Sequence, residues 1–220
     1  MFIGHFAVAL AAKRATPATS LGVLFAAAQF ADLLWPALLL AGVEHAEVVS
    51  TPGTVIPLRF VHYPYSHSLL AAVLASVFVG LLWLGCSRSI RAACVVGALV
   101  LSHWFLDLVV HVPDLPLVPG GGARWGLGLW QWPALALGLE LALFAFGAWL
   151  YLRSTKAVDG IGRWGLWSLL AMLVVIQLAN AWGPPPPSMT PVIWSGHAMW
   201  LLIAWGWWID GHRRPVLAEP

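Results

Sequence analysis

The chain has 220 residues, 60% of them hydrophobic, and its only charged side chains are 11 Lys or Arg and 9 Asp or Glu. A soluble domain carries about 25% charged and about 45–50% apolar residues. This composition therefore excludes a water-soluble protein, and its hydrophobicity excludes a disordered one. A net charge of +2 is too small to indicate a nucleic-acid partner. The composition predicts an integral membrane protein whose partner is the lipid bilayer.

The predicted fold class is all-α, a polytopic helical bundle that forms a single membrane domain over residues 1–220. The chain begins with a short apolar helix, Met1–Ala12, which is about half a span long and is interpreted as retained, either short or re-entrant. Six later segments reach the length of about 20 residues that a bilayer requires. These six predicted spans are Ser20–Val43, Ser68–Gly85, Arg91–Val112, Pro133–Leu152, Trp164–Trp182 and Pro191–Ile209.

The basic residues predict the orientation, because cytoplasmic loops carry an excess of Lys and Arg. Nine of them fall on one side of the predicted spans, and only Arg59 and Arg124 fall on the other. We therefore expect a cytoplasmic C-terminus and extracytoplasmic loops at 44–66 and 113–132. The nine are Lys13, Arg14, Arg88, Arg91, Arg153, Lys156, Arg163, Arg213 and Arg214.

Several ionisable residues lie inside the predicted spans, where one charge near the bilayer centre costs at least about 2.5–3.5 kcal/mol. At a rise of about 1.5 Å per residue, Asp32 and His103 both lie about 18 Å from the cytoplasmic end. The shared depth predicts one site in residues 1–115, with residues 133–212 as supporting helices. The residues concerned are His5, Asp32, His67, His103, Asp107, His111, Glu140 and His197.

The strongest local pattern is His103-x3-Asp107-x3-His111 inside one predicted span. Steps of four residues place all three side chains on one helix face. Because His103 and His111 are about 12 Å apart along a straight helix, we expect one ion to take Asp107 with one of the two histidines rather than with both. The alternative is a buried polar network that joins this helix to its neighbours.

A second pattern, HYPYSHS at residues 62–68, connects the long outer loop to a span. Ser66 is expected to be the N-cap of that helix, with His67 in its first turn. Imidazole is a common ligand of transition metals, so His62 and His67 are candidates to complete a site begun on the following helix. The alternative is an aromatic belt at the bilayer interface with incidental histidines.

Asp32 and Pro36 form a third pattern, because Pro36 cannot donate to the carbonyl of residue 32 and should kink the helix there. A free carbonyl beside a carboxylate suits a metal ligand or a general base. The alternative is a kink whose aspartate bonds to a neighbouring helix. Glu140 is a further candidate base or supporting carboxylate, and His5 is a candidate ligand from the half-span.

These patterns together resemble a known family. Gly4-His5, the acidic residue at 32, residues 62–68 and His103-x3-Asp107 are similar to motifs of the bacterial inner-membrane family of membrane-bound, metal-dependent hydrolases. The resemblance covers about residues 1–115 and implies a polytopic helical fold, a metal-supported hydrolytic site and the inner membrane. Two positions depart from the family pattern: Asp32 stands where two carboxylates are usual, and Tyr63 where an arginine is usual. Both departures favour a metal-binding member without activity as an alternative.

The leading hypothesis is an integral membrane hydrolase that uses a divalent transition metal, with zinc expected, and acts on a lipid-like substrate that reaches the site laterally. A bound metal lowers the pKa of its water to about 7, and Asp32 or Glu140 is expected to take the proton as the catalytic residue. The alternatives are a transport or ion-handling protein, a non-catalytic metal-binding protein and a scaffold. The predicted metal ligands are His5, Asp32, His62, His67, His103, Asp107 and His111.

Overall fold

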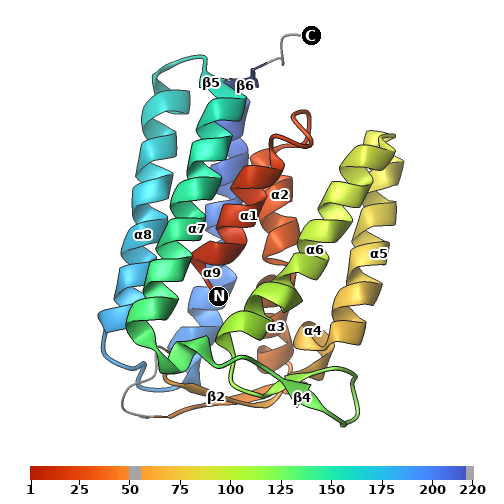
Figure 1. The fold of residues 1–220 in the computed structure, drawn as a ribbon, viewed down its shortest axis with the longest axis vertical. Coiled ribbons are helices and arrows are strands. Elements are labelled where there is room, and N and C mark those ends of the chain that lie inside the picture. Colours follow the sequence, from red (N-terminus) through yellow and green to blue (C-terminus); the bar gives the residue numbers. More distant parts are fainter. Residues whose placement is uncertain (50–55, 217–220) are drawn as a thin grey trace.

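The computed structural model describes residues 1–49 and 56–216 and is a bundle of helices (Figure 1). The predicted helical class is confirmed. The helices are α1 (Ile3–Ala12), α2 (Leu21–Ala28), α3 (Phe30–Leu40), α4 (Pro64–His67), α5 (Leu69–Ser87), α6 (Ile90–Val110), α7 (Pro133–Ser154), α8 (Leu166–Trp182) and α9 (Met189–Gly211), with a 3-10 turn η1 (Leu129–Gln131) and a π turn η2 (Ile161–Gly165).

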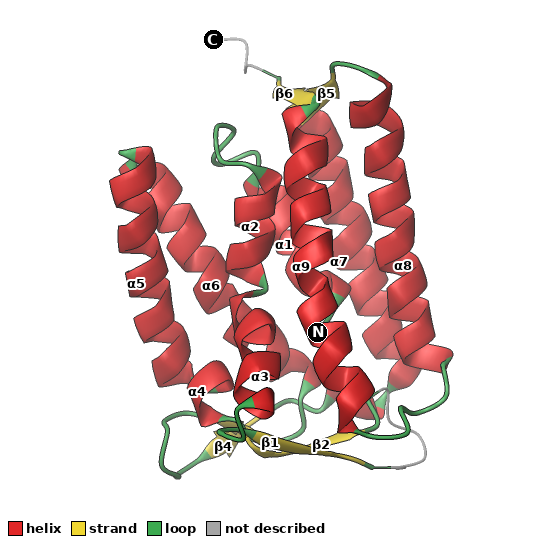
Figure 2. Cartoon of the chain, turned by 180° about the vertical axis from the view of Figure 1, so that it is seen from behind, coloured by secondary structure: helices red, strands yellow, loops and turns green. Residues whose placement is uncertain are grey.

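Three short two-stranded antiparallel sheets in the described part of the chain cover the two ends of the bundle (Figure 2). The hairpins β1–β2 and β3–β4 lie at one end, which we call the hairpin end. The pair β5–β6 lies at the other, which we call the basic end, together with the α1–α2 and α5–α6 turns (Figure 1). The strands are β1 (His45–Val48), β2 (Leu58–His62), β3 (Leu115–Pro116), β4 (Arg124–Trp125), β5 (Thr155–Ala157) and β6 (Arg213–Pro215).

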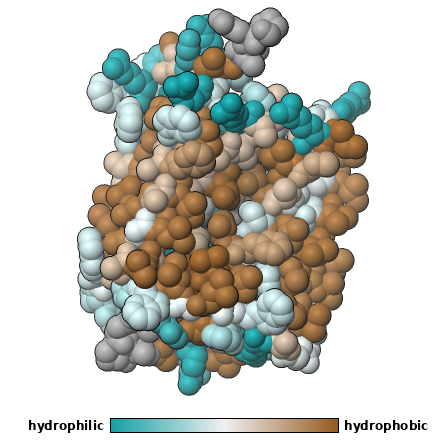
Figure 3. Space-filling model, in the orientation of Figure 1, coloured by the Kyte–Doolittle hydropathy of each residue, from teal (hydrophilic) through white to brown (hydrophobic). Residues whose placement is uncertain are grey.

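The surface between these ends is predominantly apolar in the view of Figure 3, with hydrophilic side chains gathered at both ends. The nine basic residues that the sequence placed on one side belong to the turns, strands and helix ends of the basic end. An apolar belt between two polar ends is the surface that a bilayer requires. The structure therefore supports an integral membrane protein.

The predicted count of six spans is not confirmed. Within residues 1–49 and 56–216, four helices are long and apolar enough to cross a membrane, namely α5, α6, α7 and the continuous segment Ile161–Trp182, and the bent pair α2–α3 makes a fifth if it is one span. Helix α9 has 23 residues but is not among these candidates. Its five tryptophans together with His197 lower its hydropathy, because the indole ring suits the bilayer interface better than its centre.

Helix α1 is a half-length helix held by the second half of the chain. The chain starts in the middle of the bundle and α1 runs towards the basic end (Figure 1). It packs against α7, where a Cβ added at Gly147 would lie 2.3 Å from the carbonyl oxygen of Ala7. Only glycine permits this approach, so α7 sets the position of the start of α1.

The break between α2 and α3 comes at Gln29, where the axis bends by 59°, and not at Asp32 as predicted. Gln29 leaves the helical conformation at φ −96° and ψ 11°, while Pro36 lies inside a continuous α3. The last carbonyls of a helix lack partners within it. The break therefore frees the Ala28 carbonyl, and it puts Asp32 in the first turn of α3, where the helix dipole favours a negative charge.

The start of α5 also differs from the prediction. Ser68, not Ser66, is the N-cap, and its side chain accepts a hydrogen bond from the backbone N–H of Ala71 at 3.1 Å. His67 instead ends the short helix α4, which begins at Pro64. Because a separate turn precedes α5, the side chains of Ser66 and His67 point into the protein, where both are buried.

Candidate metal centre

Four helices bring histidine and aspartate side chains together in the half of the bundle towards the hairpin end. His5, His103 and Asp107 form one group, and Asp32, His67 and His103 form another; within each group the potential ligand atoms lie within 4.8 Å of one another. His103 belongs to both, so the two groups form one cluster. We call these five residues the His/Asp cluster.

The Asp107 carboxylate lies at the centre of this cluster and is buried. Its Oδ1 lies 3.1 Å from His5 Nε2 and 2.5 Å from the backbone nitrogen of Met1. Its Oδ2 lies 3.2 Å from His103 Nε2 and 3.8 Å from His67 Nε2. One carboxylate therefore connects imidazoles from α1, α4 and α6.

The His103 ring is fixed by the break between α2 and α3. Its Nδ1 lies 2.8 Å from the carbonyl oxygen of Ala28, and since a carbonyl only accepts, Nδ1 carries the proton. In its neutral form this ring has no proton on Nε2, which faces the cluster, and the buried Nε2 has no hydrogen-bond partner in the described part of the chain. A backbone carbonyl on one nitrogen is the usual way in which a metal-binding histidine is oriented.

The His67 ring is held by a chain of polar groups from the hairpin end. Ser66 Oγ donates to Glu44 Oε2 at 2.6 Å and lies 2.7 Å from His67 Nδ1. Glu44 Oε1 also accepts from the backbone N–H groups of Tyr65 and Ser66, at 2.7 and 2.9 Å. Because the Ser66 proton goes to Glu44, His67 Nδ1 is the donor to Ser66. In the neutral form of this ring, His67 Nε2 likewise has no proton on the side of the cluster.

His111 belongs to neither group of potential ligands, but it is oriented in the same way, with Nδ1 at an outer partner and Nε2 towards Asp107. Its Nδ1 lies 2.9 Å from Asp114 Oδ1 and its Nε2 lies 3.8 Å from Asp107 Oδ2. Helix α6 ends at Val110, and His111 has extended φ and ψ of −64° and 146°. The expectation that His103 and His111 are too far apart to share Asp107 came from a straight helix. The helix end at Val110 brings both Nε2 atoms to the same carboxylate oxygen.

His5 and Glu140 meet the cluster through α1. The His5 and His103 rings are stacked, with centroids 3.8 Å apart and planes 4° apart. Glu140 on α7 is buried, and its Oε2 accepts from the backbone N–H groups of Phe2 and Gly4, at 2.8 and 3.3 Å. It therefore satisfies free donors at the start of α1 and so positions His5, while its predicted role as a base stays a prediction.

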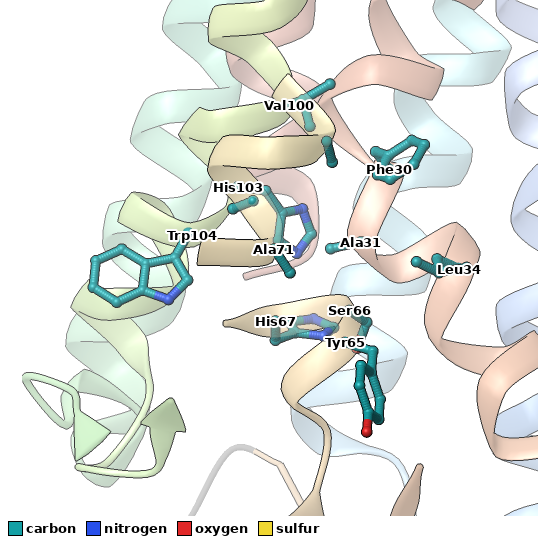
Figure 4. A pocket seen from close by; sticks show the side chains of 12 residues that line it. Phe30, Ala31, Leu34, Tyr65, Ser66, His67, Ala71, Val100, His103 and Trp104 are labelled. Atoms are coloured by element: carbon teal, nitrogen blue, oxygen red, sulfur yellow. Dashed lines mark hydrogen bonds between the residues drawn. The ribbon is translucent and has the colours of Figure 1, made fainter. Parts of the chain in front are cut away.

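Asp32 lies beside a small cavity of about 60 Å³. Its Oδ1 is 3.4 Å from His67 Nε2 and 3.7 Å from His103 Nε2, and its side chain is 24% exposed. Figure 4 shows the rings of His67 and His103 together on one side of this cavity, with Phe30 and Leu34 of α3 opposite. Among the five clustered residues, Asp32 is the one that solvent or a ligand reaches most easily.

The structure does not bring every predicted site residue to the cluster. His62 lies on β2 as an exposed residue, with a ring contact to Tyr65, and it belongs to neither group found among the described residues. His197 on α9 has its Nδ1 2.9 Å from the carbonyl oxygen of Ile193, one turn earlier, as expected of a structural histidine.

Sequence reasoning missed the residues that orient the histidines: Glu44, Ser66 and Asp114. Glu44 follows α3 and Asp114 follows α6, and neither position belongs to a repeating pattern. The signal available was an acidic residue directly after a predicted span, three residues from His111 in the case of Asp114. Two causes raise the pKa of the nearby Tyr63 hydroxyl: its burial, which is the larger, and the charge of Asp114. Tyr63 therefore stays neutral beside the His67 ring.

Comparisons with protein-family models, with curated proteins and with solved structures found no match to this chain. The geometry of the cluster and the surface around it therefore carry the evidence for a function.

Proposed function

We propose that this protein is a membrane-embedded hydrolase whose His/Asp cluster binds a divalent transition metal ion, with zinc the expected ion. One observation carries the proposal. His67, His103 and His111 each commit Nδ1 to an acceptor outside the cluster and direct Nε2 at Asp107 Oδ2, from 3.2 to 3.8 Å. Convergent imidazole nitrogens with fixed outer partners around a carboxylate are a donor set that suits zinc.

A network that only fastens helices together explains this arrangement less well. Interhelical polar contacts average only about 0.6 kcal/mol, whereas each buried polar atom without a partner costs about 1–3 kcal/mol. The buried His103 Nε2 makes no hydrogen bond in the described part of the chain. A bound cation would give this nitrogen a partner.

The chemistry follows from the residues around the cavity. A bound transition metal supplies a water molecule whose pKa is lowered to about 7. Asp32 does not line the cavity, but its Oδ1 lies 3.4 Å from Nε2 of His67, which does, and 24% of its side chain is exposed. We therefore assign it the role of general base. Glu140 is the weaker candidate, because its Oε2 already accepts two backbone hydrogen bonds. His67 and His103 hold the ion while Glu44, Ser66 and the Ala28 carbonyl hold the two rings.

Transport is the rival function, and the packing argues against it. Between the cluster and the basic end, α1, α2, α6 and α7 are joined by a continuous apolar core that includes Phe6, Leu10, Leu24, Val96 and Phe144. A transporter requires a path from its site to both sides of the membrane. The described residues place the polar groups of the cluster on one side of this core only.

We also propose the location and orientation of the protein. The nine basic residues at one end favour that end as cytoplasmic by the positive-inside rule. The hairpin end, and with it the cluster, would then be on the extracytoplasmic side. The resemblance of the first half of the chain to a bacterial inner-membrane family favours the inner membrane of a bacterium.

The proposed activity is tested with purified protein in detergent. We expect zinc-loaded protein to hydrolyse at least one member of a panel of carboxylic esters and phosphoesters of long-chain alcohols, and we expect a chelator to stop the reaction. Asp32→Asn should lose activity while it keeps the metal. The matched control is His62→Ala, which removes an exposed histidine outside the cluster and should keep both. Turnover that survives removal of the metal would contradict the proposal. Wild-type turnover by Asp32→Asn would contradict it as well.

A further inference from the structure

We infer that the substrate is an amphiphile with its hydrolysable bond next to an apolar chain, and that it enters the cluster sideways from the bilayer between α3 and α5. This inference rests on the proposed function and specifies the substrate class and route of the same site. It follows from the lining of the cavity, from the packing of the two helices and from the exposure of the surface outside.

The cavity beside Asp32 is polar at its inner side and apolar towards its mouth (Figure 4). His67 and His103 face it from α4 and α6, and Ser66 lies next to His67. The rest of the lining consists of Tyr65 and of apolar residues, four of which are alanines on α3 and α5. These apolar lining residues are Phe30, Ala31, Leu34, Ala71, Ala72, Ala75, Val100 and Trp104.

The two walls of the cavity, α3 and α5, are held apart. Helix α4 contacts both of them and closes the space towards the hairpin end, whereas α3 and α5 themselves make at most sparse backbone contact. Helix α6 forms the floor, since it packs along the whole of α5 and also touches α3. The side that faces away from α6 is left as the entrance.

The surface around this entrance is built to contact lipid. Among the candidate spans, α5 is the least buried, with 11% of its most apolar window inside the protein. Leu74, Phe78 and Leu81 on α5 are 62%, 61% and 63% exposed. An exposed apolar helix of this kind is covered by acyl chains in a membrane, so the entrance opens to the bilayer rather than to water.

The size of the cavity fits a reacting group and not a whole lipid. About 60 Å³ has room for a few water molecules, which is enough for an ester group beside a bound ion. An acyl chain of ordinary length would remain outside, between α3 and α5, in contact with the alanines and with surrounding lipid. Small side chains at the mouth and imidazoles at the inner side match the two ends of such an amphiphile.

The entrance is tested with cobalt-loaded protein, because the visible spectrum of cobalt changes when a hydroxamate binds to it. The probes are dodecanohydroxamate, which has a long chain, and acetohydroxamate, which has none. Ala75→Phe places a ring in the mouth, away from the metal ligands. The matched control is Leu74→Phe on the neighbouring lipid-facing position. Partition of the long probe into detergent is the same for both variants, so the ratio of the two affinities is the measured quantity.

We expect Ala75→Phe to lower the ratio of long-probe to short-probe affinity at least about tenfold, a change of about 1.4 kcal/mol, and Leu74→Phe to leave it unchanged. Leu34→Trp fills the opposite wall and should act like Ala75→Phe if the latter fails to fold. A cobalt-loaded Ala75→Phe protein with the wild-type ratio would overturn the lateral entrance alone. Wild-type protein that binds no cobalt would overturn the proposed function itself.

Discussion

Two buried aspartates, Asp107 in the His/Asp cluster and Asp210 at the basic end, sit in opposite surroundings. Asp210 receives only donors: Lys13 Nζ at 2.5 Å, the backbone N–H of Leu21 at 3.1 Å and the Tyr151 hydroxyl at 2.7 Å. These donors come from three other parts of the chain and satisfy both carboxylate oxygens. A buried charge that is paired and fully hydrogen-bonded in this way serves to hold helices together.

Asp107 is surrounded differently on its two oxygens. Oδ1 forms an ion pair with the amino group of Met1 and contacts His5, whereas Oδ2 is faced by the Nε2 atoms of His67, His103 and His111. In the neutral form of these rings, with the proton on Nδ1, each of the three nitrogens carries a lone pair. Lone pairs that converge on a carboxylate oxygen repel one another unless a cation lies between them. In the proposed function, Asp210 therefore acts as a clamp between helices and Asp107 as a metal ligand.

The largest expected effect separates the two aspartates by metal affinity. Asp107→Ala should weaken zinc binding by more than about a hundredfold, the upper range seen when an outer partner of a metal site is lost, because it removes the central ligand. Competition with a chromogenic chelator measures this affinity. Asp210→Ala, although it removes a buried aspartate of similar exposure, should leave the zinc affinity unchanged. If wild type and Asp107→Ala bind zinc with equal affinity, the proposed difference between Asp107 and Asp210 is wrong.

A variant that breaks the ion pair between Lys13 and Asp210 should lower the stability of the protein without changing its metal binding. Lys13→Met leaves Asp210 buried without its cation, which costs about 3–5 kcal/mol, and the loss is measured by SDS- or heat-induced unfolding in detergent. The double variant Lys13→Met with Asp210→Leu should recover most of it, since an apolar pair replaces the ion pair at little cost. A stable Lys13→Met single variant would show that Asp210 is not a clamp.

A smaller effect is expected from the residues that orient the histidines. Glu44→Gln weakens the acceptor that holds Ser66, and so the His67 ring, and it should lower zinc affinity by about 10–100-fold. Glu47→Gln is the matched control, because Glu47 pairs with Arg59 on the exposed hairpin and such pairs contribute about 0–1 kcal/mol. If both variants bind zinc like the wild type, the chain from Glu44 to His67 does not support the site.

The smallest effect concerns pH at the basic end, outside the spans. The backbone N–H of Gly162, with a lesser contribution from His212, lowers the pKa of Asp159 from its usual 3.8. A depressed folded-state pKa contributes stability above the unfolded value, and this contribution is lost as the pH falls through the folded value. Asp159→Asn should therefore slightly flatten the fall in melting temperature below pH 3.8, with no change in zinc affinity. If the melting temperature of Asp159→Asn falls below pH 3.8 just as that of the wild type does, this account of Asp159 is wrong.

The parts of the site that follow local spacing could be predicted from the sequence. His103 and Asp107 are four residues apart on one helix, so their shared face depends on helix geometry alone. The depth estimate also brought Asp32 and His103 to the same level, and the structure places their side-chain atoms 3.7 Å apart. Burial of ionisable groups in an apolar chain is expensive, so each of them stood out in the sequence.

The parts that depend on chain breaks could not be predicted in the same way. Gln29 interrupts α2–α3 and gives His103 its carbonyl acceptor, and the end of α6 at Val110 lets His111 turn back to Asp107. The break at Gln29 has no glycine or proline to signal it, and Pro113 signals only that α6 ends before it, not that His111 turns back to Asp107. Helix α9 is long enough for a span, with 23 residues. It is not among the candidate spans because its tryptophans lower its mean hydropathy.

X-ray absorption at the zinc edge of the purified, zinc-supplemented protein tests the central claim most directly. The account predicts about one zinc per chain with nitrogen and oxygen neighbours at about 2.0–2.1 Å, lost in Asp107→Ala and retained in His62→Ala. Cys86 and Cys94 are free and exposed at the basic end, so no sulfur neighbour is expected. A metal-free protein, or zinc bound by sulfur at about 2.3 Å, would contradict a metal centre in the His/Asp cluster.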